Sequence, residues 1–444
     1  MTTPVSLTLR VALACAAVLL TALAAPATAG PAERAVNPTG VKAGSRPNGV
    51  GNLQVGLSAT PDGQVQVTWR RPAPPSKLRN FVVKVGVNRQ LNKQVRKYRV
   101  GRSAQSLVVP HAAGVVPDSG NYTFVKVTVF RTGNRHGSSP TKWIQAPTTS
   151  ACTAAPDDRV TVGTFNVRNW QAESRKGNKT YPWGVRGPNV VTQILRSGVR
   201  AIAIQEASGP ENAGFGPREQ DEWLLHELNQ RDRAGQWADA LPDDAYKNPG
   251  GKPGLKGTRV FYDRTRFRLL DSGLYRIHVP GLPSDSLMPW ALLQSTTGQS
   301  APFVLTSNHL DQGEDRRSWK FRYEQITQTI QHVRTLSATF GTQVIVAGDL
   351  NETANTRPYN QAQQRLLEAG LFDAFATTNV VNARYGTTNG LDFPVRPTPN
   401  RRDYIMTFGS VRGSCKYKNV AYTRARDVAS DHFMQWATLP LPAY

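Results

Sequence analysis

The stretch Thr342-Gln343-Val344-Ile345-Val346-Ala347-Gly348-Asp349-Leu350-Asn351 carries the clearest information about the fold of this chain. The mostly β-branched run over 342–347, apolar from Val344 to Ala347, predicts a buried β-strand. The strand leads into Gly348, and two polar side chains follow. If the backbone stays extended, Asp349 and Asn351 point to the same face, because side chains alternate along a strand. One strand end would then present a carboxylate and an amide to one phosphate or one water molecule.

Four other short polar motifs lie at or near the ends of apolar runs. In chain order they are Thr164-Phe165-Asn166-Val167-Arg168, Gln205-Glu206, Asn308-His309-Leu310-Asp311 and Ser430-Asp431-His432. A further carboxylate, Asp403, stands in Arg402-Asp403-Tyr404-Ile405. Several strand ends at one edge of a fold can converge on one site. Carboxylates, Asn and His in this combination suit metal-assisted hydrolysis of a phosphate ester.

In these motifs and their order, the chain resembles the endonuclease/exonuclease/phosphatase superfamily. Its members include DNase I, AP endonucleases, neutral sphingomyelinases and inositol polyphosphate phosphatases. The resemblance covers residues 160–439, and its most specific parts are Gly-Asp-x-Asn and the terminal Ser-Asp-His. It implies an α+β fold, a DNase I-like two-layer β-sandwich flanked by helices, with the site at one edge of the sheets.

The resemblance also implies a metal site formed by Glu206, Asn166 and Asp431. Oxygen ligands favour Mg²⁺ as the ion, with Mn²⁺ or Ca²⁺ as alternatives. Asn166 is expected at the substrate phosphate as well. Arg168 matches the Asn-Ile-Arg pattern of DNase I, and it is either a bidentate phosphate ligand or a solvated loop residue.

Catalytic roles are implied for His309, Asp349, Asn351, Asp403 and His432. His432 is expected to act as the general base, with Asp403 fixing the tautomer from the other ring nitrogen. Asp349 would transfer a proton or hold the metal, and Asn351 would orient the substrate. His309 would protonate the leaving oxygen. Because residues 250–258 contain no acid to pair with it, the alternative role for His309 is that of a hydrogen-bond donor to the phosphate.

Residues 1–29 predict a secretory signal peptide. Arg10 precedes an apolar run over 11–24, and Ala27-Thr28-Ala29 forms an A-x-A cleavage site. The run is short for a membrane span, and no later segment is long and apolar enough to cross a bilayer. We therefore expect a secreted, extracellular protein without a transmembrane segment.

Two of the 3 Cys, Cys152 and Cys415, lie outside the signal peptide. In an exported protein such a pair is more often a disulfide than two free thiols or a metal site. Cys152 precedes the first hydrolase strand, and Cys415 lies between Asp403 and the final strand. A bridge would close a very long loop and stabilise the domain by several kcal/mol in the chain-entropy model.

The predicted organisation is a linker over 30–47, an all-β domain over 48–148 and the hydrolase over 149–444. In the all-β domain, short alternating runs are separated by Pro and Gly, at 53–57, 65–69, 81–87, 106–109, 122–130 and 142–144. It resembles a fibronectin type III module, an immunoglobulin-like sandwich. The resemblance rests on Trp69, on Tyr122 and on the turn Gly137-Ser138-Ser139-Pro140.

Apolar periodicity predicts alternating helices and strands in the hydrolase. Helices are expected over 189–196, 219–230 and 323–340. Strands are expected over 160–166, 201–204, 303–310 and 342–347, and 258–262 is expected to pair with 267–270. Residues 236–257 are rich in Gly, Pro and Asp and are expected to form an exposed loop.

The positive charge of +23 is concentrated in the front of the chain. Residues 30–156 contain 18 Lys and Arg against 3 Asp and Glu, whereas residues 157–444 contain 35 against 28. A basic domain suits a polyanion, because neutralising phosphates releases counterions. Nucleic acid is the favoured partner, and an anionic cell-wall polymer or membrane surface fits the charge equally well. A merely soluble basic surface is the plain alternative.

We therefore expect a secreted metal-dependent phosphodiesterase, foremost an endonuclease that cleaves extracellular DNA or RNA by metal- and His-assisted attack of water. Because a fold does not choose its substrate, two alternatives stay open. One is a sphingomyelinase-like phospholipid phosphodiesterase or another phosphoesterase. The other is a non-catalytic polyanion-binding protein, which the complete motif set argues against.

Overall fold

The computed structural model describes residues 53–59, 64–72, 75–86, 91–92, 95–110, 122–134, 136–145, 152, 154–170, 182–208, 218–246, 257–297, 300–352, 361–377, 379–382, 385–396, 401–410 and 413–442. The predicted signal peptide and the linker over 30–47 lie outside these ranges. None of the helices in this part of the chain has the length and apolar character that a bilayer crossing requires.

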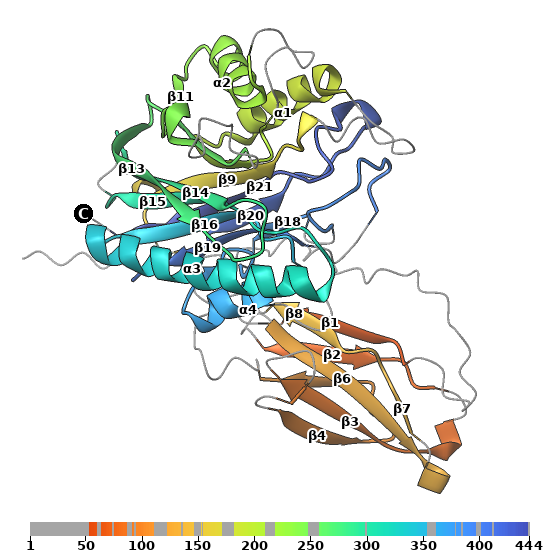
Figure 1. The fold of residues 1–444 in the computed structure, drawn as a ribbon. Coiled ribbons are helices and arrows are strands. Elements are labelled where there is room, and N and C mark those ends of the chain that lie inside the picture. Colours follow the sequence, from red (N-terminus) through yellow and green to blue (C-terminus); the bar gives the residue numbers. More distant parts are fainter. Residues whose placement is uncertain are drawn as a thin grey trace, which may run out of the picture. The chain divides into compact units, whose positions relative to one another are not determined.

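Two sheets form the centre of the region after residue 154 (Figure 1). In the described residues, the first sheet has the order β11 (Trp237–Asp239), β12 (Arg259–Asp263), β10 (Ala201–Gln205), β9 (Arg159–Asn166), β21 (Gln435–Pro440), β20 (Lys416–Asn419) and β18 (Val380–Val381). The second has the order β13 (Phe267–Ile277), β14 (Ser286–Ser295), β15 (Phe303–His309), β16 (Gln343–Asp349), β19 (Asp403–Phe408) and β17 (Phe372–Asp373).

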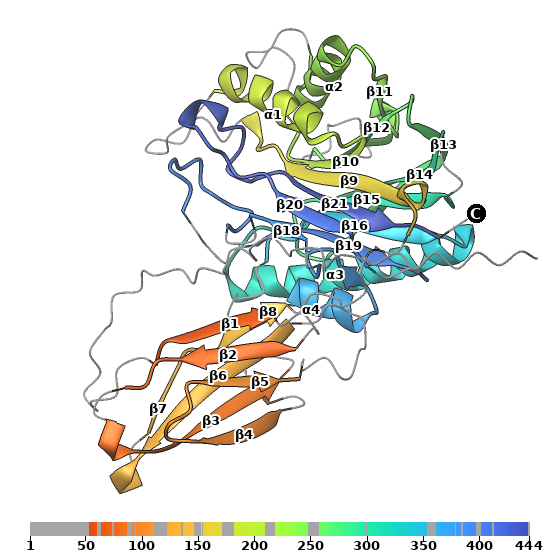
Figure 2. The same cartoon turned by 180° about the vertical axis from the view of Figure 1, so that it is seen from behind.

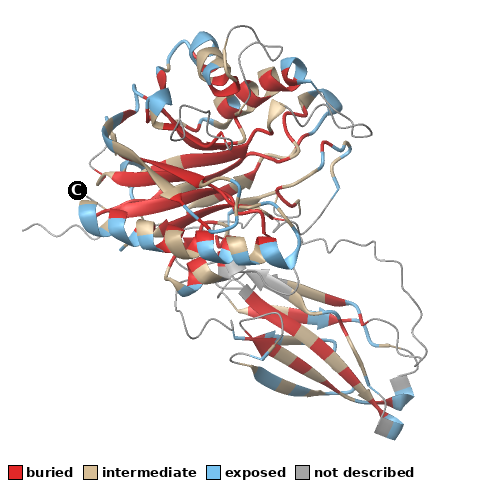
Figure 3. Ribbon diagram, in the orientation of Figure 1, coloured by how far each residue is buried: buried red, intermediate tan, exposed pale blue. Residues whose placement is uncertain are grey.

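Three apolar layers hold this region together. Side chains from both sheets meet in the middle layer, which includes Val162, Ala203, Leu305 and Ile345. The two outer layers lie between each sheet and its helices. The central strands are therefore buried on both faces, as the burial colouring in Figure 3 shows. Strands covered on both sides favour a continuous apolar sequence, and this explains runs such as 344–347.

Helices cover the outer face of each sheet (Figure 2). α1 (Trp183–Ser197) and α2 (Gln220–Arg231) pack on the first sheet, and α3 (Arg316–Phe340) and α4 (Gln361–Glu368) pack on the second. α1 begins earlier than the predicted residue 189, although Gly184, Gly187 and Pro188 are poor helix formers. Burial of Trp183, the first residue of α1, in the apolar layer between the helices and the first sheet compensates for this low propensity. The α+β class and the helix-flanked pair of sheets agree with the prediction.

The predicted pairing of 258–262 with 267–270 is wrong. β12 pairs with β10 and β11 in the first sheet, whereas β13 pairs with β14 in the second. A tight turn separates them, in which the Asp263 carboxylate accepts hydrogen bonds from the backbone N–H and hydroxyl of Thr265. The chain thus crosses from one layer to the other. The expected loop over 236–257 also contains β11 and a short 3-10 helix over Asp243–Tyr246.

The front of the chain forms strands over most of the predicted runs. One sheet has the order β1 (Val55–Ala59), β2 (Val65–Trp69) and β5 (Ser106–Val109). The other has the order β4 (Arg96–Gly101), β3 (Leu78–Gly86), β6 (Tyr122–Arg131) and β7 (His136–Ser138), with β8 (Lys142–Gln145) also pairing with β6. Trp69 is buried in an apolar cluster with Phe81, their ring centroids 5.4 Å apart. The likeness to a fibronectin type III module remains a prediction.

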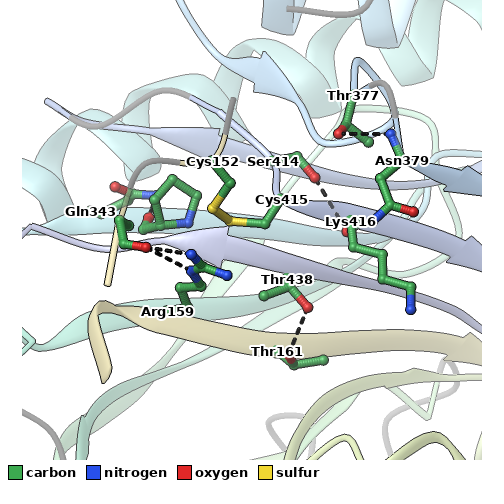
Figure 4. Close-up of a disulfide and its surroundings, with 12 residues drawn as sticks. Cys152, Arg159, Thr161, Gln343, Thr377, Asn379, Ser414, Cys415, Lys416 and Thr438 are labelled. Carbon is green, nitrogen blue, oxygen red and sulfur yellow. Dashed lines mark hydrogen bonds between the residues drawn. A yellow bond between two sulfur atoms is a disulfide. The ribbon is translucent and has the colours of Figure 1, made fainter. Parts of the chain in front are cut away.

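A disulfide joins Cys152 to Cys415 across 263 residues (Figure 4). Their Cα atoms are 4.8 Å apart, within the usual range for a bridged pair. Beside it, β9 and β21 pair antiparallel, and the hydroxyls of Thr161 and Thr438 share a hydrogen bond of 2.9 Å. The bridge therefore fastens the start of the hydrolase region to the strands near its end.

Candidate active site

Strand direction brings the polar motifs to one edge of the two sheets. β9 and β10 are parallel, with Asn166 opposite Gln205, and β15 and β16 are parallel, with His309 opposite Asp349. Parallel strands end at the same edge of a sheet. The antiparallel strand β19 begins there, with Asp403 opposite Asp349. The carboxyl ends of four strands and the start of a fifth, from two sheets, thus meet at this edge.

The Asn166 side chain connects the two sheets at this edge. Its amide nitrogen donates to Glu206 Oε1 at 2.8 Å and to Asp349 Oδ2 at 3.0 Å. Glu206 Oε2 accepts from the backbone N–H of Asn169 at 3.0 Å. Glu206 is therefore oriented from both sides, whereas its side chain keeps 25% of its surface exposed. An oriented, partly open carboxylate can bind an incoming ligand.

Asp349 lies between the two candidate histidines. His309 Nε2 and His432 Nε2 each lie 3.7 Å from Asp349 Oδ2, and His309 Nε2 is 3.6 Å from Glu206 Oε1. The side chain of Asp349 is only 1% exposed. Burial and the charge of neighbouring Asp403 raise the pKa of Asp349 above its usual 3.8. The environment therefore disfavours a full set of negative charges at this position.

The imidazole of His432 is held by Asp403. His432 Nδ1 lies 2.8 Å from Asp403 Oδ2 and 3.1 Å from Asp403 Oδ1. This leaves Nε2 facing Asp349. Burial lowers the pKa of His432, but the opposing attraction of Asp403 and Asp349 is stronger and keeps it well above the usual 6.5. Arg402, which precedes Asp403, does not compete for this contact, because its side chain pairs with Glu314 at 2.9 Å.

Arg168 and Asp431 form an ion pair at the same edge. Arg168 Nη1 lies 2.7 Å from Asp431 Oδ2, with side-chain exposures of 10% and 28%. Arg168 is therefore not a solvated loop residue. The structure places the Asp431 carboxylate against this guanidinium rather than in the tight groups of candidate metal ligands formed by the described residues.

Three motif residues other than glycine have left-handed backbone conformations. The φ angles are 62° at Arg168, 60° at Glu206 and 51° at Asn351. Such conformations cost about 1–3 kcal/mol each and persist where the surrounding structure enforces them. The expectation that 349–351 stays extended is wrong, because β16 ends at Asp349 and Asp349 Oδ1 accepts from the backbone N–H of Asn351 at 2.8 Å. The Asn351 amide instead donates to the Leu310 carbonyl at 3.0 Å.

The donor set fits a divalent cation. Among the described residues, single ligand atoms of Glu206, His309 and Asp349 lie within 4.8 Å of one another, and so do those of Asp349, Asp403 and His432. Carboxylate oxygens are the preferred ligands of Mg²⁺ and Ca²⁺. Burial, and then the neighbouring charge of Asp403, raise the pKa of Asp349, and a cation would offset this buried negative charge. Glu206 and Asp349 are the residues best placed to hold it.

Two buried arginines that the motifs did not reveal support the site. Arg186 of α1 is fully buried and donates to the backbone carbonyls of Val167 and Arg168, the latter at 2.8 Å. Arg322 of α3 is 1% exposed and donates to the carbonyls of Asp311 at 2.8 Å and Gly313 at 2.6 Å. Each arginine thus holds the loop that follows a catalytic strand. For Arg186, the sequence signal is a charged residue on the otherwise apolar face of α1.

Comparison with known proteins gives structural neighbours only. No family model and no curated protein matches the chain. The crystal structure of the endonuclease/exonuclease/phosphatase from Bacteroides vulgatus is similar at 18% identity, covering 64% of this chain and 99% of that chain, with a TM-score of 0.49. The mannosyl-6-phosphatase of Bacteroides thetaiotaomicron VPI-5482 is similar at 19% identity, covering 63% and 98%, with a TM-score of 0.47.

The catalytic domain of human Nocturnin with bound sulfate is also similar, at 16% identity, covering 65% of this chain and 96% of that chain, with a TM-score of 0.44. The structural neighbours thus include proteins of the endonuclease/exonuclease/phosphatase family. At such low identity the chemistry of this chain has to be inferred from its own side chains.

Proposed function

We propose that this protein is a secreted, metal-dependent phosphoric ester hydrolase, and foremost an endonuclease. The observation that carries the proposal is the convergence of Glu206, His309, Asp349, Asp403 and His432 from separate strands on one edge. A structural role alone would not require three carboxylates and two imidazoles in contact, because burying like charges together is unfavourable. A site for a cation and a phosphate accounts for this arrangement.

The geometry supports water attack with the proton taken by His432. Asp403 holds Nδ1 of His432, so that Nε2 is the atom that accepts the proton. It can do so only when the imidazole is neutral, and the raised pKa of His432 shifts that form to higher pH. The new bond forms between the water oxygen and phosphorus. The opposite P–O bond breaks, and His309 donates a proton or a hydrogen bond to the leaving oxygen. Asn166 and Arg168 would orient the phosphate, and Asn351 would hold the loop after β16.

Glu206 and Asp349 would hold the cation, with Mg²⁺ expected and Mn²⁺ or Ca²⁺ as alternatives. When bound, it would offset the negative charge that develops on the phosphoryl oxygens in the transition state. The carboxylates are already oriented by Asn166 and the backbone, so they need little rearrangement to bind. Such preorganisation is where most electrostatic stabilisation of a transition state originates.

A substrate panel distinguishes the nuclease from the other phosphoesterases. Plasmid DNA, RNA, sphingomyelin and inositol phosphates should be incubated with the protein in EDTA and with Mg²⁺, Mn²⁺ or Ca²⁺. We expect nicking of plasmid DNA that EDTA abolishes and added cation restores. Turnover of sphingomyelin alone would favour the phospholipid phosphodiesterase, and turnover that resists EDTA would contradict the metal site.

Single substitutions test the assignment of the residues. Glu206→Gln and His432→Ala should each reduce turnover by at least about 10²-fold, the scale for loss of an acid–base or charge-stabilising group. His278→Ala is the matched control, because His278 is 71% exposed and pairs only with surface Asp285 among the described residues. Folding should be checked by circular dichroism. Unchanged turnover in a folded His432→Ala protein would refute its role.

A further inference from the structure

A row of three lysines crosses one sheet in the front part of the chain. In the registers of β4, β3 and β6, Lys97 lies opposite Lys84, and Lys84 lies opposite Lys126. Their neighbours Val83, Val85 and Val125 are buried in the apolar cluster on the other face of the sheet. Because side chains alternate along strands, the three lysines leave the same, outer face. We call this set the lysine row.

The lysine row should lower the stability of the folded domain when no partner is bound. Like charges directly opposite one another on adjacent strands repel. Asp62 and Asp118 are the acidic residues between positions 53 and 145, and both lie outside the described part. Arg99, which lies opposite Val82 on the same face, adds a further positive charge. The arrangement is explained if the charges meet an anionic partner.

We propose that the lysine row binds the phosphate backbone of nucleic acid. Adjacent strands lie about 4.8 Å apart, so the row spans roughly 10 Å. Duplex DNA carries one negative charge per about 1.7 Å of its axis, so roughly six charges fall within that span. Lys84 and Lys126 are half-buried, which fixes their stems, whereas Lys97 is exposed. The row thus matches a dense, linear series of phosphates without reading the bases.

A membrane surface fits the lysine row less well. Peripheral membrane binding usually combines basic residues with an exposed apolar anchor. The exposed large apolar side chains among the described residues are Val108, Val185, Leu270 and Tyr323, and none of them lies on β3, β4 or β6. The outer face of this sheet therefore provides charge without such an anchor. This favours a polyanion in solution.

The inference rests on the proposed function only in the choice of nucleic acid as the polyanion. Binding can be measured in EDTA, where no metal-dependent cleavage occurs. Hydrolysis can be measured separately on a small phosphodiester that carries a single phosphate. If the protein binds nucleic acid through the lysine row but does not hydrolyse the phosphodiester, the proposed function is wrong. If the protein hydrolyses the phosphodiester but substitution of the lysine row leaves nucleic-acid binding unchanged, the inference about the lysine row is wrong.

The test compares two variants of the full chain that lose the same charge. The row variant is Lys84→Gln/Lys97→Gln/Lys126→Gln. The control variant is Arg70→Gln/Arg71→Gln/Lys77→Gln, which changes exposed residues outside β3, β4 and β6. Affinity for a duplex of about 30 base pairs is measured by fluorescence anisotropy between about 50 and 200 mM salt. The slope of log K against log salt counts the phosphates that each protein neutralises.

We expect the row variant to reduce this slope by about 2.7 and to weaken binding at low salt by at least about tenfold, because each phosphate contact contributes about 0.9. The control variant should reduce the slope by less than about 1. Equal changes in both variants, or an unchanged slope in the row variant, would overturn the proposal. Loss of binding to phosphatidylserine vesicles with unchanged duplex binding would overturn it as well.

Stability provides an independent readout. Removing like charges that face one another should leave the melting temperature unchanged or raise it. If the triple variant unfolds at a clearly lower temperature, the single variant Lys97→Gln replaces it, because Lys97 is exposed and supports no core contact. Its slope should fall by about 0.9. An unchanged slope in this folded single variant would refute the contact.

Discussion

Arg186 shows how a buried residue can support a site through contacts with backbone carbonyls alone. Its guanidinium lies under the loop after β9 and over the ring of Trp183, with 4.7 Å from Cζ to the ring centroid. It also approaches the Ala429 carbonyl at 3.5 Å, just before the Ser-Asp-His motif. One buried cation therefore connects two loops that carry Arg168 and His432. The planar guanidinium is suited to this, because its donors have a fixed geometry.

We predict that Arg186→Lys lowers kcat by about 10–100-fold while the protein stays folded, the scale seen when outer-shell partners of a metal site are lost. The charge remains, but one ammonium group cannot reach both carbonyls in the same geometry. Steady-state kinetics and thermal unfolding measure the effect. Arg196→Lys, at an exposed position in the last turn of α1, is the control. A kcat within twofold of the native value would contradict a positioning role.

Asp239 predicts a specific pH dependence of stability. Burial is the main cause that raises its pKa to about 7 from 3.8, and the nearby Arg259 only partly opposes this. The folded protein therefore keeps the proton as the pH rises from about 4 to about 7, whereas the unfolded chain has lost it. The stabilisation is complete below about pH 4 and is lost as the pH rises through about 7. It amounts to about 1–4 kcal/mol.

Asp239→Asn should therefore flatten the decline in unfolding free energy between about pH 4 and 7, because the amide has no proton to release. Denaturant unfolding at several pH values measures this. Asn can still accept at Oδ1, where Asp239 accepts from Leu241 and from the Tyr246 hydroxyl. Asp271→Asn, at an exposed position, is the control for loss of one charge. Parallel pH profiles of Asp239→Asn and the native protein would refute the prediction.

At the scale of strands and helices, the direction of each strand determines which motif side chains meet. The sequence predicts the strands that end in Asn166, Glu206, His309 and Asp349, because each is a long apolar run with a polar end. It does not predict that β12 and β13 belong to different sheets, because the turn between them is as short as a hairpin connection. Nor does periodicity reveal β11 or β18, which are very short and take their stability from neighbouring strands.

The sequence likewise predicts some features of the candidate site and not others. The motifs identify the side chains that lie at the edge, because function requires chemically unusual residues at strand ends. They do not identify the turn at Asn351, because its left-handed backbone depends on contacts with Asp349 and Leu310. Arg322 likewise stays hidden, since its partners are backbone carbonyls, which leave no pattern in the sequence.

Gly348 lets two neighbouring strands of the site, β15 and β16, approach each other closely. Its φ is 145°, and an added Cβ would overlap the backbone of Asn308 on the neighbouring strand. We predict that Gly348→Ala destabilises the fold by about 2–5 kcal/mol, from backbone strain and steric overlap together. Chemical denaturation measures the loss. Gly184→Ala in α1 is the control, because nothing lies within 4 Å of its added Cβ, and it should be neutral or stabilising by up to about 1 kcal/mol. Equal stability of both variants would contradict the prediction.

At the scale of the whole molecule, the disulfide between Cys152 and Cys415 closes a very long covalent loop. In the chain-entropy model a bridge across 263 residues stabilises the native state by about 5 kcal/mol. We predict that Cys152→Ser/Cys415→Ser lowers the unfolding free energy by about 2–5 kcal/mol and leaves kcat nearly unchanged. Denaturant unfolding measures the first quantity. Peptide mapping without reductant should recover the linked peptides from the native protein, and alkylation of both thiols in unreduced protein would exclude the bridge.

The pairing of β9 with β21 has a consequence for biosynthesis. β9 is made early and lies between β10 and β21, but β21 is made more than 260 residues later. A nascent chain therefore cannot complete the middle of this sheet until nearly all of the hydrolase region has emerged. Premature termination would remove both His432 and β21, the neighbour of the central strand β9. Partial synthesis should thus yield a substrate for proteolysis rather than a weakened enzyme.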